Sequence, residues 1–161
     1  KGLPYLLEAF SELDTPNVEL ALIGSMLDEV KEKIPQDNSK IRLLGIIPRS
    51  ELYKYYSQAS VFVLPSIQDG FGAVIAQAMA CGLPVIATTN TGGPDIITDG
   101  VEGFIVPIRN PNAIREKLLY LYQNPDIRDK MAQAALERVQ SVGGWAEYGE
   151  RSVQAYKQLL A

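Results

Sequence analysis

Two short loops of small and polar residues stand where the chain could do chemistry. The first, Ser66–Gly70, follows the apolar run Val61–Leu64 and precedes an uncharged segment, Phe71–Cys81, that is expected to form a helix. Amides at the start of a helix have no partner within it, so those of Phe71–Val74 suit an anionic ligand such as a diphosphate. Asp69 comes just before them and is also a residue type that caps helices.

The second loop, Thr88–Gly93, follows another apolar run, Val85–Ala87. Strand, loop, helix, strand and loop in this order place both loops at the carboxyl ends of parallel strands, where open α/β sheets bind ligands. The turn at Gly92 and Gly93 is therefore a further candidate for binding phosphate through its backbone. Glycines also serve tight turns alone, so both interpretations stay open.

Gln77 lies within the uncharged segment. Its neighbours on the same side of the expected helix are Ala73, Ala76 and Ala80, three or four residues away. A solvated helix face would usually carry Lys or Glu, so this amide is expected to be enclosed. It either lines a cleft or is buried against a backbone partner.

The composition excludes several function classes. The 161 residues suffice for one domain, and 15 basic against 19 acidic residues argue against a surface that binds nucleic acid. A single cysteine excludes an internal disulfide and any multi-cysteine metal site, and the absence of histidine removes the commonest general base. No apolar run reaches the roughly 18 residues of a membrane span, and no signal peptide is visible.

Strands and helices are expected to alternate, which is typical of an α/β fold with a Rossmann-like, doubly wound parallel sheet. Helices are expected at the carboxyl-terminal end of the chain. The chain opens on a helix, where such a fold normally opens on a strand, so either the fold starts unconventionally or a first strand is missing. The expected strands are Val18–Ile23, Ile41–Leu44, Val61–Leu64, Val85–Ala87 and Gly103–Val106. The expected helices are Leu3–Leu13, Met26–Ile34, Ser50–Ala59 with Ser50 as cap, Phe71–Cys81, Pro94–Asp99, Ala113–Gln123, Asp126–Gln140 and Trp145–Leu160.

Several motifs occur in an order that resembles a known family. They include Asp69–Gly72, Gln77–Ala87 and Gly92–Asp95. The whole chain, residues 1–161, is similar to the carboxyl-terminal, donor-binding domain of retaining glycosyltransferases with the GT-B fold, of the group 1 or family 4 type. Further matches lie at Lys1-Gly2, Gly45–Glu51, Asp99-Gly100, Gly103-Phe104 and Trp145.

The resemblance implies roles for the residues at the two loops. In the family, two glutamates separated by seven residues contact the hydroxyls of the transferred sugar and the nucleotide ribose; here Asp69 and Gln77 hold these positions. Aspartate is shorter but keeps two acceptor oxygens, and glutamine keeps one acceptor and gains a donor. Lys1 resembles the lysine that neutralises the diphosphate, although a lysine at a chain end is otherwise a solvated charge.

Three further positions have implied roles and plain alternatives. Ile46 and Ile47 would read the base through their backbone or pack at a strand end, and Asp95 would lie near the phosphates or cap its helix. The expected catalytic residues are thus Asp69 and Lys1, and the expected donor-binding residues are Gln77, Gly70, Phe71, Gly72, Ala73, Val74, Ile46, Ile47, Gly92, Gly93 and Asp95.

As the resemblance implies, the parent enzyme would bind a nucleotide-diphospho-sugar and transfer the sugar to an acceptor with retention of configuration, without a metal or other cofactor. The acceptor site and a catalytic histidine would belong to an amino-terminal domain, so this chain alone is expected to bind donor weakly and to transfer nothing. The expected partners are the nucleotide-sugar donor and that domain, with no nucleic acid. The expected location is the cytoplasm, including the inner face of the membrane if the other domain associates with it.

Two alternatives stay open. The chain is either a degenerate, non-catalytic module kept for interaction, as the loss of both glutamates suggests, or part of another GT-B enzyme such as a nucleotide-sugar epimerase or hydrolase. A Rossmann oxidoreductase is disfavoured because no G-x-G-x-x-G motif follows the strand at Val18–Ile23.

The resemblance also makes a structural prediction. If the strand order is 3-2-1-4-5-6, the missing strand is central, and the strands at Val18–Ile23 and Val61–Leu64 flank a gap. Upstream residues, swapped elements or a partner would fill it. In the family the last helix crosses back toward the amino-terminal domain; in the alternative, Trp145, Tyr148 and Tyr156 pack on this domain's own sheet.

Overall fold

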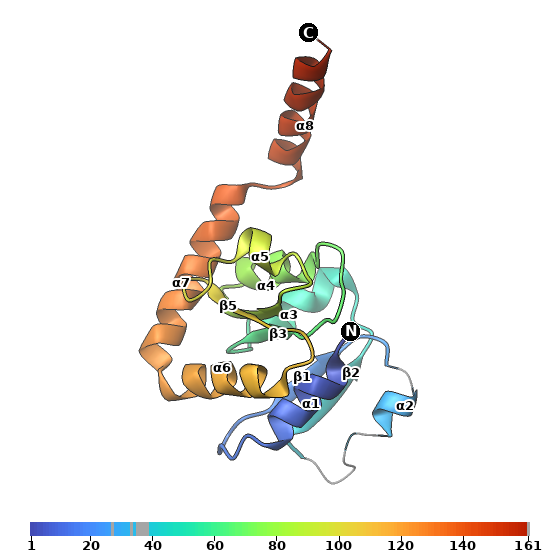
Figure 1. Ribbon diagram of the computed structural model, residues 1–161, viewed down its shortest axis with the longest axis vertical. Coiled ribbons are helices and arrows are strands. Elements are labelled where there is room, and N and C mark those ends of the chain that lie inside the picture. The colour runs from blue at the N-terminus through green and yellow to red at the C-terminus, as the bar shows by residue number, and fades with distance from the viewer. Residues whose placement is uncertain (27, 33, 35–38, 161) are drawn as a thin grey trace.

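The computed structural model describes residues 1–26, 28–32, 34 and 39–160. It is an α/β fold with parallel strands covered by helices (Figure 1). The strands are β1 (Leu20–Ile23), β2 (Ile41–Gly45), β3 (Phe62–Leu64), β4 (Val85–Thr88) and β5 (Gly103–Val106). The helices are α1 (Leu3–Ser11), α2 (Asp28–Lys31), the 3-10 turn η1 (Arg49–Glu51), α3 (Leu52–Tyr56), α4 (Val74–Ala80), α5 (Gly93–Ile96), α6 (Pro111–Gln123), α7 (Pro125–Val142) and α8 (Trp145–Leu159).

The strands form two separate parallel sheets. One has the order β1-β2 and the other β3-β4-β5, with Phe62 opposite Val85 and Val85 opposite Gly103. Among the described residues, β1 and β3 do not pair with each other. The absence of pairing between β1 and β3 agrees with the prediction that these strands flank a gap, and within each sheet the neighbouring strands are those of the predicted order.

The core lies on both faces of β4, whose four residues are all buried. Val85 and Ala87 belong to a cluster with Ile75 and Met79 of the β3–β4 crossover, whereas Ile86 belongs to a second cluster with side chains of α1, α6, β1 and β5. Side chains alternate across a strand, so this division shows α4 on one face and α1 and α6 on the other (Figure 1). An ion pair between Arg115 and Glu12 joins α6 to α1.

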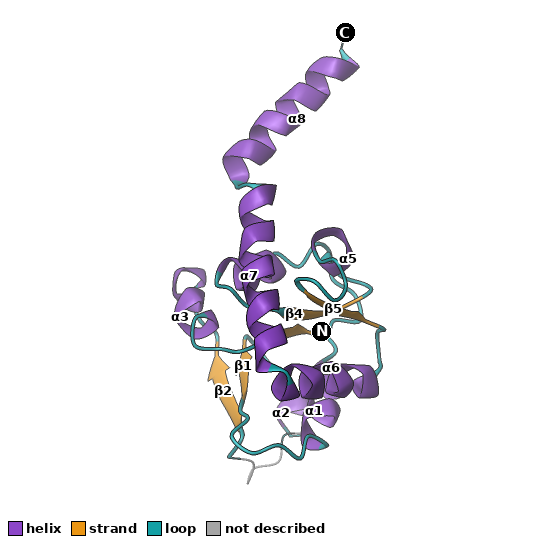
Figure 2. Cartoon of the chain, turned by 90° about the vertical axis from the view of Figure 1, so that its left-hand side faces the viewer, coloured by secondary structure: helices purple, strands orange, loops and turns teal. Residues whose placement is uncertain are grey.

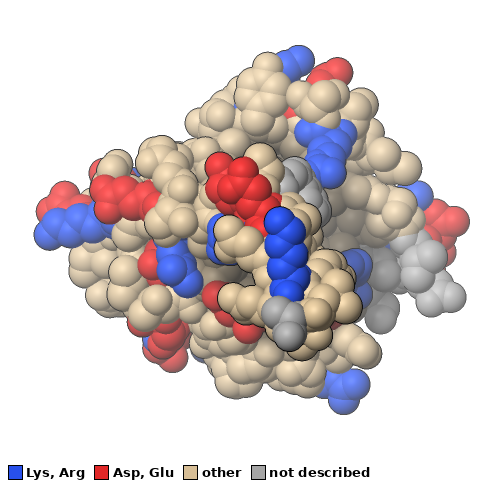
Figure 3. Space-filling model, turned by 90° about the horizontal axis from the view of Figure 1, so that it is seen from above, with Lys and Arg blue, Asp and Glu red and all other residues tan. Residues whose placement is uncertain are grey.

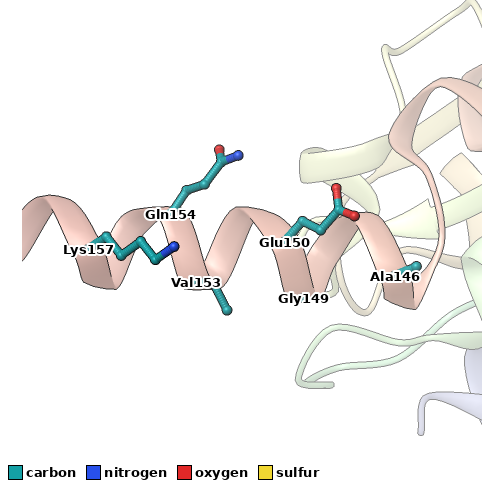
Figure 4. Close-up of a pocket in the computed structure, with 6 residues that line it drawn as sticks. All are labelled: Ala146, Gly149, Glu150, Val153, Gln154 and Lys157. Carbon is teal, nitrogen blue, oxygen red and sulfur yellow. The ribbon is translucent and has the colours of Figure 1, made fainter.

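Helix α8 stands clear of the sheets in both views (Figures 1 and 2). The side chains of Tyr148 and Tyr156 are 63% and 67% exposed, so the alternative in which this helix packs on the domain's own sheet is wrong. The side chain of Trp145 lies outside the part of the chain that the structure describes. A hollow on α8 is lined by residues of that one helix alone, which cannot enclose a ligand (Figure 4).

The face from which α8 projects carries acidic and basic side chains interspersed among uncharged ones (Figure 3). No described helix has both the length and the apolar character that a membrane span requires.

The expected helices differ from the observed ones mostly by one to two residues at an end, and four of them differ by more. Helix α4 begins at Val74 rather than Phe71, because Gly72 has φ +69°, a left-handed conformation that a helix cannot contain. Ser50 caps nothing: the chain enters α3 through the turn η1, and neither element has a side-chain cap. Helix α5 ends at Ile96 because the next residue is extended. Helix α2 is described only over Asp28–Lys31.

Candidate functional site

The two loops that follow β3 and β4 are joined by backbone hydrogen bonds. The amide of Asp69 donates to the carbonyl of Asn90 at 3.0 Å, and that of Gly92 donates to the carbonyl of Phe71 at 3.0 Å. A side chain at Gly92 would not fit, because its Cβ would lie 2.1 Å from the Phe71 oxygen. The loops therefore form one unit at the carboxyl edge of the sheet, as the sequence predicts.

The expected phosphate donors divide into two groups. The amides of Phe71, Gly72, Ala73 and Val74 have no protein acceptor among the described residues, whereas the amide of Gly92 donates to Phe71 and that of Gly93 donates to the Thr91 hydroxyl at 3.0 Å. A ligand can bind the first group without breaking a protein hydrogen bond. It would have to replace an existing acceptor at the second.

Asp69 forms an ion pair with Lys1 across 68 positions of sequence. The ammonium Nζ lies 2.5 Å from Oδ2, and the hydroxyl of the buried Ser66 donates to the same oxygen at 3.4 Å. The hydrogen bond from Lys1 is the main cause that holds the pKa of the Asp69 carboxyl below its usual value, against the opposing effect of burial. Asp69 does not cap α4, which has no side-chain cap, so that alternative is wrong.

Gly2 places Lys1 beside the loop. Its φ is +76°, and a Cβ there would lie 1.8 Å from the carbonyl oxygen of Pro65, so the start of α1 sits directly on the end of β3. The buried Thr88 hydroxyl donates to the carbonyl of Ser66 at 2.5 Å, and the Thr91 hydroxyl donates to the carbonyl of Thr88 at 2.8 Å. This network fixes the backbone of both loops. None of its three hydroxyl-bearing residues, Ser66, Thr88 and Thr91, was predicted as functional.

Gln77 is half-buried, and its partner is the side chain of Arg49. The amide faces Arg49 with its oxygen, because the opposite orientation would turn its NH₂ group toward other donors. In this orientation Oε1 accepts from Nε at 3.1 Å and from Nη2 at 3.3 Å. The sequence predicted that Gln77 is enclosed but not that Arg49 is its partner, because Arg49 was interpreted only as a residue next to the start of a helix.

Ile46 follows β2 and is 78% exposed, and Ile47 is half-buried. Ile46 borders a hollow of about 300 Å³ at the carboxyl ends of β1 and β2, whose lining includes Gly24, Ser25 and Gly45. Asp95 lies in the first turn of α5, is exposed, and forms no cap there. Whether these three residues contact a donor stays a prediction. Among the described residues, no group of three or more His, Cys, Asp or Glu side chains could hold a metal ion.

Comparison with known proteins decides the family. The family described as "Glycosyl transferases group 1" matches residues 1–138. The chain belongs to the group 1 glycosyl transferases. Two of its relatives in this group are an uncharacterised glycosyltransferase of Methanocaldococcus jannaschii, 33% identical over 85% of the chain, and D-inositol 3-phosphate glycosyltransferase of Kribbella flavida, 34% identical over 72%.

The chain spans only part of these relatives. It covers 39% of the Methanocaldococcus protein and 27% of the Kribbella protein. Sucrose-phosphate synthase from Thermosynechococcus elongatus superposes with a TM-score of 0.87 and 29% identity, over 99% of this chain and 42% of that one. The carboxyl-terminal domain of a group 1 protein from Francisella tularensis, solved by itself, has a TM-score of 0.79 and 27% identity, over 88% of this chain and 78% of that one.

The fold is thus that of the carboxyl-terminal domain of a GT-B glycosyltransferase, as the sequence predicts. An Anabaena protein whose structure contains UDP has the same fold, with a TM-score of 0.88 and 21% identity, over 98% of this chain and 45% of that one.

Proposed function

We propose that this chain binds a nucleotide-diphospho-sugar at the joined loops and is the donor-binding domain of a retaining glycosyltransferase. One observation carries the proposal: the unpaired amides of Phe71–Val74, the Lys1–Asp69 pair and the Gly92 loop lie together at the carboxyl edge of the sheet. Unpaired amides and an ammonium are donors for phosphate oxygens, and a carboxylate is an acceptor for sugar hydroxyls.

Each of these groups has a role in the proposed complex. The amides of Phe71–Val74 and the ammonium of Lys1 bind the diphosphate; the ion pair with Asp69 uses one of the three ammonium donors and leaves two for phosphate. Asp69, kept ionised by its lowered pKa, accepts hydrogen bonds from the sugar hydroxyls. Gln77 faces the ribose, and the backbone at Ile46 and Ile47 lies along the base. Asp95 lies near the phosphates.

The proposed transfer breaks the bond between the anomeric carbon and the phosphate oxygen. The nucleoside diphosphate leaves with the bonding electron pair, and the acceptor oxygen bonds to the anomeric carbon on the same face and gives its proton to the departing phosphate oxygen. Lys1 and the loop amides stabilise the charge that develops on the leaving phosphate, which is where preorganised donors contribute most. No metal or cofactor is assigned to this step.

Relatives with known ligands support this class of substrate. The Anabaena protein has been crystallised with UDP-glucose, and the Kribbella relative is a glycosyltransferase acting on D-inositol 3-phosphate. We extend the donor class, and not the acceptor, to this chain. A second, amino-terminal domain would supply the acceptor site and any membrane association, and the complete enzyme would act on the cytoplasmic side.

Calorimetric titration of the chain with UDP-glucose, GDP-mannose and ADP-glucose tests the proposal. At least one of them should bind, and Asp69→Asn should weaken binding of the sugar nucleotide more than that of the free diphosphate, because only the former carries the sugar. Gly149→Ala on α8, where an added methyl group meets no atom within 4 Å, is the matched control. Binding of none of the three would refute the proposal. Sugar transfer by the chain alone would refute the role of a second domain.

One alternative is favoured by a specific observation. Asp69 and Gln77 are each held by a protein side chain, Lys1 and Arg49, as expected for a degenerate module that no longer transfers sugar. Changing both to glutamate in the protein that includes the acceptor domain separates the two functions. A large gain in transfer marks a decayed site, and an unchanged or lower rate supports the enzyme proposed here.

A further inference from the structure

We infer that Arg49 is a positioning residue of the donor site, which fixes the amide of Gln77 and adds a positive charge beside it. The inference rests on the proposed function, because it concerns how the same site holds a nucleotide. Arg49 belongs to η1, which follows Ile46 and Ile47, and Gln77 belongs to α4, which follows the loop at Asp69–Ala73. No strand pairing among the described residues joins the two sheets at this point, so the pair is a side-chain link between them.

The geometry determines which atoms of Gln77 remain for a ligand. Nε and Nη2 of Arg49 both donate to Oε1, at 3.1 and 3.3 Å, so the two lone pairs of the amide oxygen are occupied. Only the NH₂ group is then left to meet the nucleotide. A carboxylate at this position would accept hydrogen bonds from a ribose, whereas Gln77 donates one to a ribose oxygen.

The charge of Arg49 is not cancelled by this contact. The guanidinium is always protonated, Gln77 is neutral, and no described carboxylate forms an ion pair with Arg49. The nearest acidic residue in sequence, Glu51, pairs with Lys54 instead, at 3.5 Å. The site therefore presents a net positive group that attracts the anionic nucleotide, and this attraction weakens as salt is added.

A double-mutant cycle in donor affinity tests the inference. Arg49→Ala and Gln77→Ala should each weaken binding of UDP, GDP or ADP by about tenfold, the usual size of one charge-assisted hydrogen bond. The double variant should lose no more than Arg49→Ala alone, because Gln77 contributes only when Arg49 positions it. Arg42→Ala is the control: it removes the same charge from an exposed side chain on β2 whose partner is Glu19.

Two further measurements separate positioning from charge and from a merely structural role. Arg49→Lys keeps the charge but not the fork, so its affinity should stay low while its salt dependence stays that of the wild type. In the absence of nucleotide, the side-chain NH₂ resonances of Gln77 should move in Arg49→Ala and not in Arg42→Ala. Because Arg49 is exposed, its truncation should leave the unfolding midpoint unchanged.

The outcomes distinguish this inference from the proposed function. If the wild type binds nucleotide and Arg49→Ala binds equally well, or if the two single losses multiply in the double variant, the inference is wrong and the proposed function stands. If the wild type binds none of the three nucleotides, both the proposed function and this inference are wrong. Coupled losses, together with the amide shift at Gln77, establish it.

Discussion

The three-stranded and two-stranded halves of this molecule both consist of parallel strands, but they differ in how far those strands are buried. In the three-stranded half, β4 is buried along its whole length and Ile86 is 0% exposed. In the two-stranded half, Leu43 of β2 is 49% exposed and Ile23 of β1 is 36% exposed. Both halves use short parallel strands. The loops that follow β3 and β4 therefore rest on a closed core, whereas the loops that follow β1 and β2 rest on an open sheet.

This difference bears on function because the proposed site uses both halves. The loops that follow β3 and β4 are held by backbone hydrogen bonds and by buried hydroxyls, so their position does not depend on a ligand. In the two-stranded half, β1 pairs with β2 and with no described strand of the other sheet, and a further strand between β1 and β3 would complete one sheet. We therefore expect the two halves to differ in their response to mutation, in the rate of amide hydrogen exchange, and in their response to a strand supplied between β1 and β3.

The largest expected effect is on stability. Ile86→Ala in β4 should lower the free energy of unfolding by about 2–5 kcal/mol, because it leaves a cavity in a close-packed core. Leu43→Ala in β2 should cost less than about 1 kcal/mol, since half of that side chain is already in water. Urea unfolding of both variants measures the contrast. Equal losses would abolish the distinction between the halves.

The next effect is on the hydrogen-bonded contact between the loops that follow β3 and β4. Gly92→Ala places a methyl group 2.1 Å from the Phe71 oxygen, so the loops must separate and nucleotide affinity should fall by about tenfold or more, the equivalent of at least one hydrogen bond. Gly149→Ala on α8 should bind as the wild type does. Calorimetry gives the affinities and circular dichroism checks that both variants are folded. Wild-type affinity in Gly92→Ala would show that this contact is not needed.

A smaller effect should appear in amide hydrogen exchange. Amides of β1 and β3 border the gap, so they should exchange at least about tenfold faster than those of β4, which open only when the core unfolds. A form of the protein that supplies a parallel strand between β1 and β3 should slow exchange at both. If such a strand protects neither, the gap is not a strand site.

The smallest expected effect is on pH dependence. The pKa of Asp69 is lowered in the fold, chiefly by Lys1, so the pair stabilises the folded state above the ordinary carboxyl pKa of about 4. This contribution is lost as pH falls through the lowered, folded-state value. Thermal unfolding from pH 6 to pH 2 should therefore decline less steeply in Asp69→Asn than in the wild type. Identical slopes would show that the pair contributes no stability.

The sequence predicts the buried half well because burial there leaves a local pattern. The strand at Gly103–Val106 is found with the predicted bounds, and the run at Val85–Ala87 is extended by one residue only. Such strands are continuous apolar runs between glycines and prolines, as parallel strands buried on both faces should be. The lack of pairing between β1 and β3 was predicted from the strand order that the family resemblance implies, together with the missing first strand.

The rest depends on contacts between distant residues, which no local pattern records. Arg49 and Gln77 are far apart in sequence and meet only after β2 and β3 have been placed. The start of α4 was misplaced because the left-handed backbone at Gly72 is set by the loop's contact with its neighbour, and not by the uncharged composition of the segment. Lys1 and Asp69 were each predicted as site residues, but their direct pairing was not.

Mapping the binding surface by NMR tests the central claim most directly. In a ¹⁵N-labelled sample titrated with UDP-, GDP- and ADP-sugars, the amide resonances of residues 69–74 and 92–95 should shift together, with a single affinity, for at least one of the three. Saturable binding that leaves both segments unmoved, with shifts confined to α8 or to the far end of the sheet, would contradict it.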